Sequence, residues 1–355
     1  MRLSKSFRVS FVLAGMIVSS LTTFAGNEDR AGSAGATELL INPWSRSSSW
    51  GGAGVSSIKG LEALFSNVAG LAYADKTEII FARTNWLGGI SDIALNGFGL
   101  AQRVGENGVM GVSIMSMNFG DIPITTTELP EGNIGTFKPV FTNINLAYAR
   151  QFSSSISGGL NLKIVSEAIS NVKASGVAVD IGIRYATGEN DQIKFAISLK
   201  NVGAPLEYSG DGISLEMLNP NTGILITSEQ RVSSFELPSL LHIAASYDFL
   251  FDESNKLTMG FVYTSNSFSK DQYRLGGEYT FSGLKQAYFI ARAGYIYENG
   301  IFDNVNRTNS LTGLSAGLSV DFPVGKNETM IGIDYGYRSS TLGGIHSIGG
   351  RINLK

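Results

Sequence analysis

The segment Val177-Ala178-Val179-Asp180-Ile181-Gly182-Ile183-Arg184-Tyr185 alternates large apolar residues with small or charged ones. Successive side chains of a β-strand point to opposite faces of its sheet, so this pattern predicts a strand with one apolar and one polar face. The same period of two returns at 257–263, 314–322 and 331–338. Because segments of this kind follow one another to the C-terminus, the sequence predicts an all-β fold.

The connections between these segments alternate in length. Short polar turns such as Ser153-Ser154-Ser155 and Asp252-Glu253-Ser254 occupy every second connection, and the long connections, 120–138, 202–237 and 298–310, all lie between them. Outer-membrane barrels have short periplasmic turns and long extracellular loops. We therefore expect a transmembrane antiparallel β-barrel of about 14 strands over 76–355, in the outer membrane, with both termini periplasmic. The expected strands are 77–86, 91–104, 108–119, 139–152, 156–168, 176–187, 192–201, 238–250, 255–265, 272–281, 286–297, 311–322, 328–338 and 345–354.

The strand phase assigns two faces to this barrel. The apolar set is expected to face outer-membrane lipid and the charged set the lumen. A water-soluble sandwich also alternates, but it turns its apolar face inward and needs two sheets. The lumenal charges either pair and fill the barrel or line a ligand path. The charges expected in the lumen are Lys163, Asp180, Arg184, Arg274, Glu278, Arg292, Asp321, Asp334, Arg338 and Arg351.

Residues 1–25 have the pattern of a secretory signal peptide. Arg2, Lys5 and Arg8 precede the apolar run 9–21, and Thr23-Phe24-Ala25 places small residues where a signal peptidase cleaves. The run is shorter than the roughly 20 residues of a spanning helix. Cleavage after Ala25 is the prediction.

Residues 26–75 differ from the rest because they are rich in Gly, Ser and Ala. Within them, Ile58, Leu61, Leu64 and Phe65 fall at helical spacing behind a possible N-cap at Ser56 or Ser57. A segment of this size cannot bury a core alone. We expect it to fill the periplasmic end of the barrel as a plug with a short helix.

Composition excludes several functions. Without the signal peptide, 24 Lys and Arg oppose 30 Asp and Glu, so a nucleic-acid partner is not expected. The chain has no cysteine, which excludes disulfides, thiol catalysis and thiolate metal sites. The 43 glycines and 13 tyrosines suit turns, crowded lumens and bilayer rims.

The sequence predicts no enzyme, cofactor or metal site. His242 lies on the polar phase of its strand and His346 opens the last strand, and neither belongs to a nucleophile motif. The loop acids lack calcium-loop spacing. Gly51-Gly52-Ala53-Gly54 lacks the βαβ context of a phosphate loop, so close packing of the plug is its expected role.

Three phrases in order carry a family resemblance. They are the ten residues at 31–40 (AGSAGATELL), then Trp50-Gly51-Gly52-Ala53-Gly54-Val55, then the thirteen residues at 60–72 (GLEALFSNVAGLA). This order resembles the PorV/PorQ family of Bacteroidota outer-membrane barrels, a FadL-like branch related to the long-chain fatty-acid transporter, and it is closer to PorV. Val68 stands where the family usually has proline.

The resemblance implies a non-enzymatic component of the type IX protein secretion system. Its implied partners are secreted cargo with its C-terminal signal domain, a large translocon barrel, and the surface attachment-complex proteins to which cargo is passed. The alternative, from the wider barrel family, is a FadL-like transporter of hydrophobic small molecules. That alternative predicts an apolar pocket between plug and wall and a side opening at a kinked strand.

The two longest loops, 120–138 and 202–237, display apolar residues, which indicates a protein partner. Loops that fold back to cap the barrel are the alternative. The candidate partner-binding residues are Ile122, Ile124, Leu129, Ile134, Phe137, Leu215, Met217, Leu218, Leu225 and Phe235.

Overall fold

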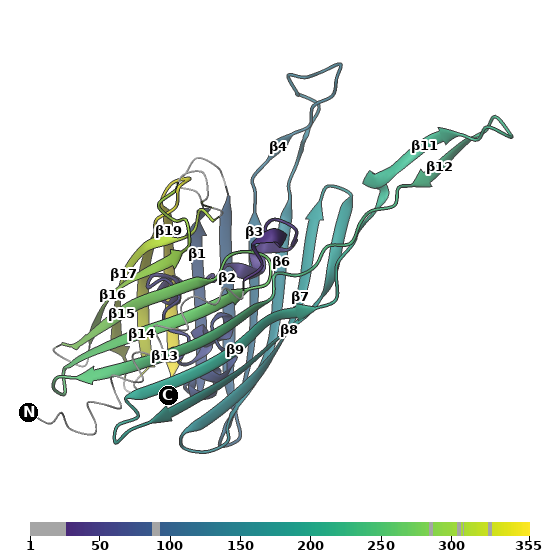
Figure 1. Ribbon diagram of the computed structural model, residues 1–355. Coiled ribbons are helices and arrows are strands. Elements are labelled where there is room, and N and C mark those ends of the chain that lie inside the picture. Colours follow the sequence, from purple (N-terminus) through teal and green to yellow (C-terminus); the bar gives the residue numbers. More distant parts are fainter. Residues whose placement is uncertain (1–25, 87–92, 284–286, 304–306, 308, 326–328) are drawn as a thin grey trace, which may run out of the picture.

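The computed structural model describes residues 26–86, 93–283, 287–303, 307, 309–325 and 329–355, and the predicted signal peptide lies outside them. Fourteen antiparallel strands form a closed barrel (Figure 1). The first and last strands pair, with Thr77 opposite Leu354, which closes the ring. The barrel strands are β1 (Thr77–Asn85), β2 (Ala94–Val104), β3 (Gly108–Asn118), β6 (Val140–Gln151), β7 (Ile156–Ile169), β8 (Val172–Thr187), β9 (Ile193–Gly203), β13 (Leu240–Leu250), β14 (Asn255–Asn266), β15 (Gln272–Ser282), β16 (Tyr288–Glu298), β17 (Gly313–Val324), β18 (Thr329–Arg338) and β19 (Ile345–Leu354).

The predicted all-β barrel is confirmed, and the strand ends agree with the predicted ones to within four residues. The expected starts at 91, 286 and 328 lie outside the described residues. Side chains follow the predicted phase on β8, where Ile181 and Ile183 are 49% and 56% exposed while Asp180 and Arg184 are buried. Exposed apolar residues on every barrel strand form an outer belt that is stable in lipid rather than in water.

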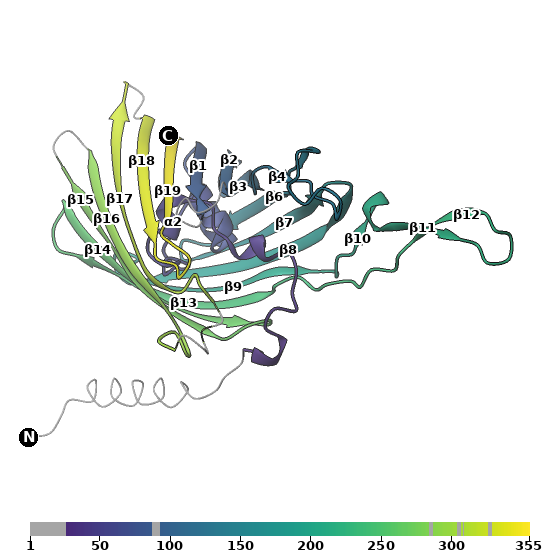
Figure 2. The same ribbon diagram turned by 90° about the horizontal axis from the view of Figure 1, so that it is seen from above.

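Two of the long loops form hairpins instead of folding over the barrel. The short strands β4 (Ile122–Pro123) and β5 (Thr136–Phe137) pair in one loop. In the other, β10 (Tyr208–Ser209) extends the barrel sheet beside β8, the 3₁₀ helix η7 (Asp211–Ile213) follows, and β11 (Ser214–Leu218) pairs with β12 (Leu225–Glu229). Figures 1 and 2 show both hairpins projecting beyond the barrel rim.

The segment that precedes β1 runs inside the barrel (Figure 2). It contains η2 (Glu28–Arg30), η3 (Thr37–Leu40), α2 (Ser45–Ser48), η4 (Leu61–Phe65) and η5 (Val68–Tyr73). No helix among the described residues has the length and apolar character needed to cross a bilayer. We call residues 26–76 the plug.

The plug spans more of the barrel than the sequence predicted. It starts at the long-loop end, where the Asn27 amide donates to the Asn266 carbonyl and Arg30 pairs with Glu236 at 2.5 Å. It ends at the short-turn end, where β1 begins. The expected confinement to one end was therefore wrong. A segment of this length, mostly in short helical turns and extended stretches, covers more distance than one compact helix.

The predicted helix around 57–65 is also shorter than expected. Residues up to Ser57 form turns, and the helix begins at Leu61 as a 3₁₀ helix. Gly60, with φ of 76°, separates the two, and such a backbone is open mainly to glycine. Ser56 is not the N-cap of this helix, because its hydroxyl donates a hydrogen bond to Ser246 on the barrel wall.

Glycines on the inner wall make room for the plug backbone. A Cβ atom on Gly276 would lie 2.7 Å from the Trp50 carbonyl oxygen, and one on Gly336 would lie 2.7 Å from the Ser45 carbonyl oxygen. The apolar core forms where the plug meets the strands from β1 to β6, around Trp44, Leu61 and Leu71. Plug and wall are thus packed as one body on this side.

Candidate functional site: a cavity between plug and wall

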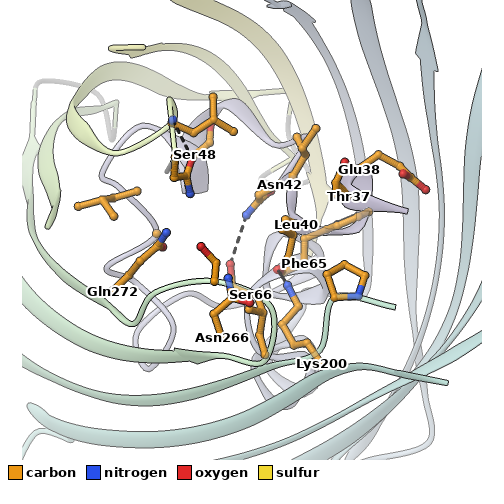
Figure 3. A pocket seen from close by; sticks show the side chains of 18 of the residues that line it. Thr37, Glu38, Leu40, Asn42, Ser48, Phe65, Ser66, Lys200, Asn266 and Gln272 are labelled. Carbon is orange, nitrogen blue, oxygen red and sulfur yellow. Dashed lines mark hydrogen bonds between the residues drawn. The ribbon is translucent and has the colours of Figure 1, made fainter. Parts of the chain in front are cut away.

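A cavity of about 490 Å³ lies between the plug and the barrel wall. Plug residues between 32 and 66 form one side of it, and the long-loop ends of wall strands form the other. Figure 3 shows Asn42, bonded to Ser66 at 3.3 Å, at the plug side, with Asn266 and Gln272 on the wall. This volume is typical of a small-molecule site. We call it the lumen cavity.

One part of the lumen cavity is apolar and rich in aromatic side chains. Phe119 and Phe141 stack edge to face with ring centroids 4.8 Å apart. Aromatic and branched side chains bind apolar molecules through area burial and specific ring contacts. The apolar lining comprises Leu40, Ile41, Val55, Phe65, Trp86, Met117, Phe119, Phe141, Leu240, Phe268, Ile296 and Leu311.

The other part carries cations. Lys200 of β9 donates from Nζ to the Phe65 carbonyl at 2.5 Å and points across the cavity toward the plug in Figure 3. Arg274 of β15 donates to Gln272 at 2.9 Å, and Arg338 of β18 donates to the Leu311 carbonyl at 3.2 Å. Within the described residues, none of the three forms a salt bridge, although each lines the cavity.

Charged side chains in a partly desolvated site attract an opposite charge strongly, because the low dielectric weakens screening. An apolar wall beside three cations without ion pairs is therefore suited to a molecule with an apolar body and an anionic group. His242 lines the same cavity and is held by Thr264, with Nδ1 and the hydroxyl oxygen 2.9 Å apart.

Glu38 also lines the cavity, but its carboxyl turns away from the centre toward the wall in Figure 3. It is 2% exposed. Burial, together with the nearby Glu167 carboxylate, raises the pKa of Glu38 to about 8. The Glu38 carboxyl is therefore not directed at a molecule in the cavity.

Five of the ten predicted lumenal charges join one buried network. Arg292 pairs with Glu278 at 2.6 Å, and Arg351 contacts Asp334 at 2.7 Å and Asp321 at 2.6 Å. Every member of this group lies on β15 to β19. Such pairing is the structural role that the sequence left open for lumenal charges.

The plug joins that network through two residues. Arg46 approaches Glu278 at 3.3 Å, and Glu62 lies 3.8 Å from Arg46 and 3.6 Å from Arg351. Burial raises the pKa of Glu62 to about 7, against the lowering influence of Arg46 and Arg351. The network therefore holds the plug to the wall on the short-turn side of the lumen cavity.

The remaining five predicted charges divide between wall, plug and cavity. Lys163 pairs with Asp180 at 2.7 Å, both fully buried. Arg184 donates to the Ser56 carbonyl at 2.8 Å and stacks over Tyr73. Arg274 and Arg338 line the lumen cavity. Lys200 was not among the predicted lumenal charges. It alternates in phase with Lys194 and Ser198 on β9, and this phase would have predicted that its side chain faces the lumen.

A bulge interrupts the wall between β8 and β9. Asp180 stands opposite both Lys200 and Asn201, since Val179 pairs with Val202 while Ile181 pairs with Leu199. Asn201 has φ of 59°, and its amide donates to Asp180 at 2.8 Å. Bulges re-aim side chains, and this one sits where Lys200 enters the cavity. Pairing resumes on both sides of it.

The predicted partner-binding residues do not gather at the cavity. Ile122, Ile124, Leu129, Ile134 and Phe137 lie in the loop that carries β4 and β5, and all but half-buried Phe137 are exposed. Leu215, Met217, Leu218 and Leu225 lie exposed on the β11–β12 hairpin. Phe235 instead packs against Tyr208 with ring centroids 5.4 Å apart and the rings tilted by 39°, so it belongs to the barrel rim.

No three His, Cys, Asp or Glu side chains come close enough to hold a metal ion among the described residues. His346 is exposed on β19, where its Nδ1 lies 2.8 Å from the Tyr335 hydroxyl. The two histidines therefore occupy separate sites, one in the cavity and one on the outer face.

The sequence matches no protein family and no curated protein. Its fold is similar to those of solved outer-membrane proteins. The monoaromatic hydrocarbon channel CymD superimposes with a TM-score of 0.55 at 12% identity, covering 89% of this chain and 98% of that one. The Pseudomonas putida toluene transporter TodX gives 0.53 at 10% identity, covering 93% and 98%. The Ralstonia pickettii toluene transporter TbuX gives 0.50 at 12% identity, covering 89% and 98%.

These similarities concern the fold, since identity is low. They support the FadL-like part of the predicted resemblance and give no support to the narrower PorV/PorQ assignment. The chain therefore shares its barrel fold with these proteins, and the type IX secretion role predicted from its N-terminal phrases gains no support from them.

Proposed function

We propose that this protein is an outer-membrane channel for small hydrophobic molecules, with short turns in the periplasm and long loops outside. The lumen cavity carries the proposal, because it joins an aromatic wall to Lys200, Arg274 and Arg338. Hydrophobic transport was the sequence's alternative reading. It is favoured over secretion by this cavity and by the names of the similar structures, which are those of hydrocarbon and toluene channels.

The expected cargo is an apolar molecule with an anionic group. The apolar pocket that this alternative predicted forms only part of the lining, because Lys200, Arg274 and Arg338 also line the cavity. The proposal therefore differs from simple hydrocarbon passage. A molecule such as decanoate fits this chemistry, and the matched neutral alcohol decanol serves as its comparison.

Binding to the lumen cavity is measured through tryptophan fluorescence, since Trp86 lines it. We expect decanoate to bind more tightly than decanol, by at least about ten-fold for one retained charge interaction. Lys200→Met should reduce that preference while leaving decanol binding unchanged. Lys256→Met, on a wall lysine outside this cavity, is the control. Equal affinity for both molecules in all three proteins would contradict the proposal.

A second candidate function is supported by the β11–β12 hairpin. Leu215, Met217 and Ile226 share one face of it, since Met217 pairs with Ile226, and all three are exposed. An isolated two-stranded hairpin is marginal in water. We therefore keep a membrane-protein partner, such as the secretion translocon implied by the PorV/PorQ resemblance, as the second proposal.

That proposal has its own test. Extraction in a gentle detergent should co-purify a large translocon barrel with the wild-type protein and not with a variant whose residues 214–229 are replaced by a Gly-Ser linker. Decanoate binding by the shortened variant should be unchanged. If no partner co-purifies with the wild type, the hairpin carries no such function.

A further inference from the structure

A second polar site lies behind the lumen cavity, where η3 of the plug meets β6 and β7. Glu38, Asn143 and Glu167 are each no more than 3% exposed. On the wall, Phe141 pairs with Glu167 and Asn143 with Val165, so Asn143 and Glu167 are diagonal neighbours on the inner face. The Glu38 carboxyl lies against both of them.

Three acceptor oxygens of this site lack a donor at hydrogen-bonding distance and angle, although the Glu167 and Asn143 side chains lie near the Glu38 carboxyl. Both carboxylate oxygens of Glu38 and the Oδ1 atom of Asn143 are buried and without a hydrogen-bond partner among the described residues. A buried acceptor left without a donor destabilises the folded state, and more so when it is charged. The nearest lysine on the same face of β7 is Lys163, which is already paired with Asp180 at 2.7 Å.

A single proton between the two carboxyls would satisfy only part of this set, because it can be donated to one acceptor at a time. A divalent cation bound between the three side chains would contact oxygens of all of them and neutralise both carboxylates. Hard cations such as Ca²⁺ take six to eight oxygen ligands from carboxylates, amide oxygens and water. The site offers oxygen and no thiolate or imidazole, which favours Ca²⁺ or Mg²⁺ over Zn²⁺.

We propose that Glu38, Glu167 and Asn143 bind one divalent cation, of the calcium class, that joins the plug to the barrel wall. The surrounding residues support this assignment. The Tyr208 hydroxyl donates to Glu167, as outer partners of ligating carboxylates do. Glu38 also lines the lumen cavity, so the proposed ion site lies directly behind that cavity. The proposal is independent of what the cavity itself carries.

Calcium titration tests the site directly. The full protein, extracted in detergent and stripped with EDTA, is titrated with CaCl₂ by calorimetry, and MgCl₂ is titrated in parallel. We expect one saturable Ca²⁺ site in the wild type and in Glu128→Gln, a control on an exposed loop carboxylate. Glu38→Gln and Glu167→Gln should each weaken that binding by at least about ten-fold.

Thermal melting separates a cation site from a structural role. Ca²⁺ should raise the Tm of the wild type, because it binds the folded state only. In EDTA, Glu38→Gln should melt above the wild type, since it removes a buried carboxylate, and it should not respond to Ca²⁺. Asn143→Asp adds a ligand charge and should tighten Ca²⁺ binding, which keeps a test available if the Gln variants fail to fold.

The proposal is overturned by any of three results. The wild type could fail to bind Ca²⁺, its binding could be unchanged in both Glu38→Gln and Asn143→Asp, or acid alone could stabilise the wild type while Ca²⁺ has no effect. The last result would assign the pair to a shared proton.

Discussion

Trp50 of the plug and Gly276 of β15 are in backbone contact, because a Cβ atom on Gly276 would lie 2.7 Å from the Trp50 carbonyl oxygen. The same Cβ would lie 2.9 Å from the Ala53 methyl group. Gly260 and Gly294 on the neighbouring strands face the plug in the same way. The plug backbone therefore contacts the wall directly, because the glycines at these positions carry no side chain that would hold it away.

This contact predicts the effect of one methyl group. Gly276→Ala should displace the plug from β15, lower the Tm and raise the ion conductance of the barrel in planar bilayers. Overpacking of this kind costs about 1–3 kcal/mol. Gly350→Ala is the matched control, because a Cβ there meets nothing within 4 Å. Equal Tm and equal conductance in both variants would mean that the plug can shift to accommodate the added methyl group at Gly276.

The buried network predicts a strong effect of its central arginine. Arg351→Met leaves Asp334, Asp321 and Glu62 without their shared cation while retaining much of the apolar stem. Breaking a buried ion pair in this way costs about 3–5 kcal/mol. Urea unfolding should show the loss, and Arg83→Met, at an exposed arginine of β1, should show little. If Arg351→Met lowers the free energy of unfolding only slightly, the three acids instead become protonated and stay buried without destabilising the folded state.

Glu62 predicts how the stability of the plug depends on pH. Its pKa is raised from 4.5 to about 7, first by burial. At this group the folded state then binds more protons than the unfolded state, so the contribution of Glu62 to the free energy of unfolding falls as pH rises from about 4.5 to about 7 and is level above it. A shift of this size corresponds to an effect on the order of 3 kcal/mol.

The measurement is the Tm of the wild type and of Glu62→Gln across that pH window. The variant should remove the part of the slope that Glu62 contributes. Identical slopes in both proteins would assign the pH dependence to other groups.

The strands could be predicted from the sequence because their signal is local. The alternating positions of Asp180 and Ile181 are enough to predict that one side chain faces the lumen and the other faces lipid. Short turns between the segments predict where the strands end. The plug could not be predicted in the same way. Gly60 ends the apparent helix through a positive φ that no spacing reveals, and the path of residues 26–42 depends on contacts such as Arg30 with Glu236, far apart in sequence.

The cavity could not be predicted from the sequence either, because residues far apart in the chain line it. Phe65, Phe141 and Leu311 come from the plug and from opposite parts of the ring, so only closure of the barrel brings them together. Lys200 had a readable inward phase, but its cavity role depends on the bulge at Asn201. The resemblance in the N-terminal phrases predicted the barrel class, and its secretion role stays a prediction.

We propose that the lumen cavity takes part in the passage of a small hydrophobic anion through the barrel. The most direct measurement is uptake of radiolabelled decanoate into proteoliposomes that contain the wild type or Lys200→Met, with Lys256→Met as control. We expect uptake above that of protein-free liposomes for the wild type and Lys256→Met, and a clear reduction for Lys200→Met. Uptake equal to that of protein-free liposomes in every case, with the barrel shown to be folded, would contradict it.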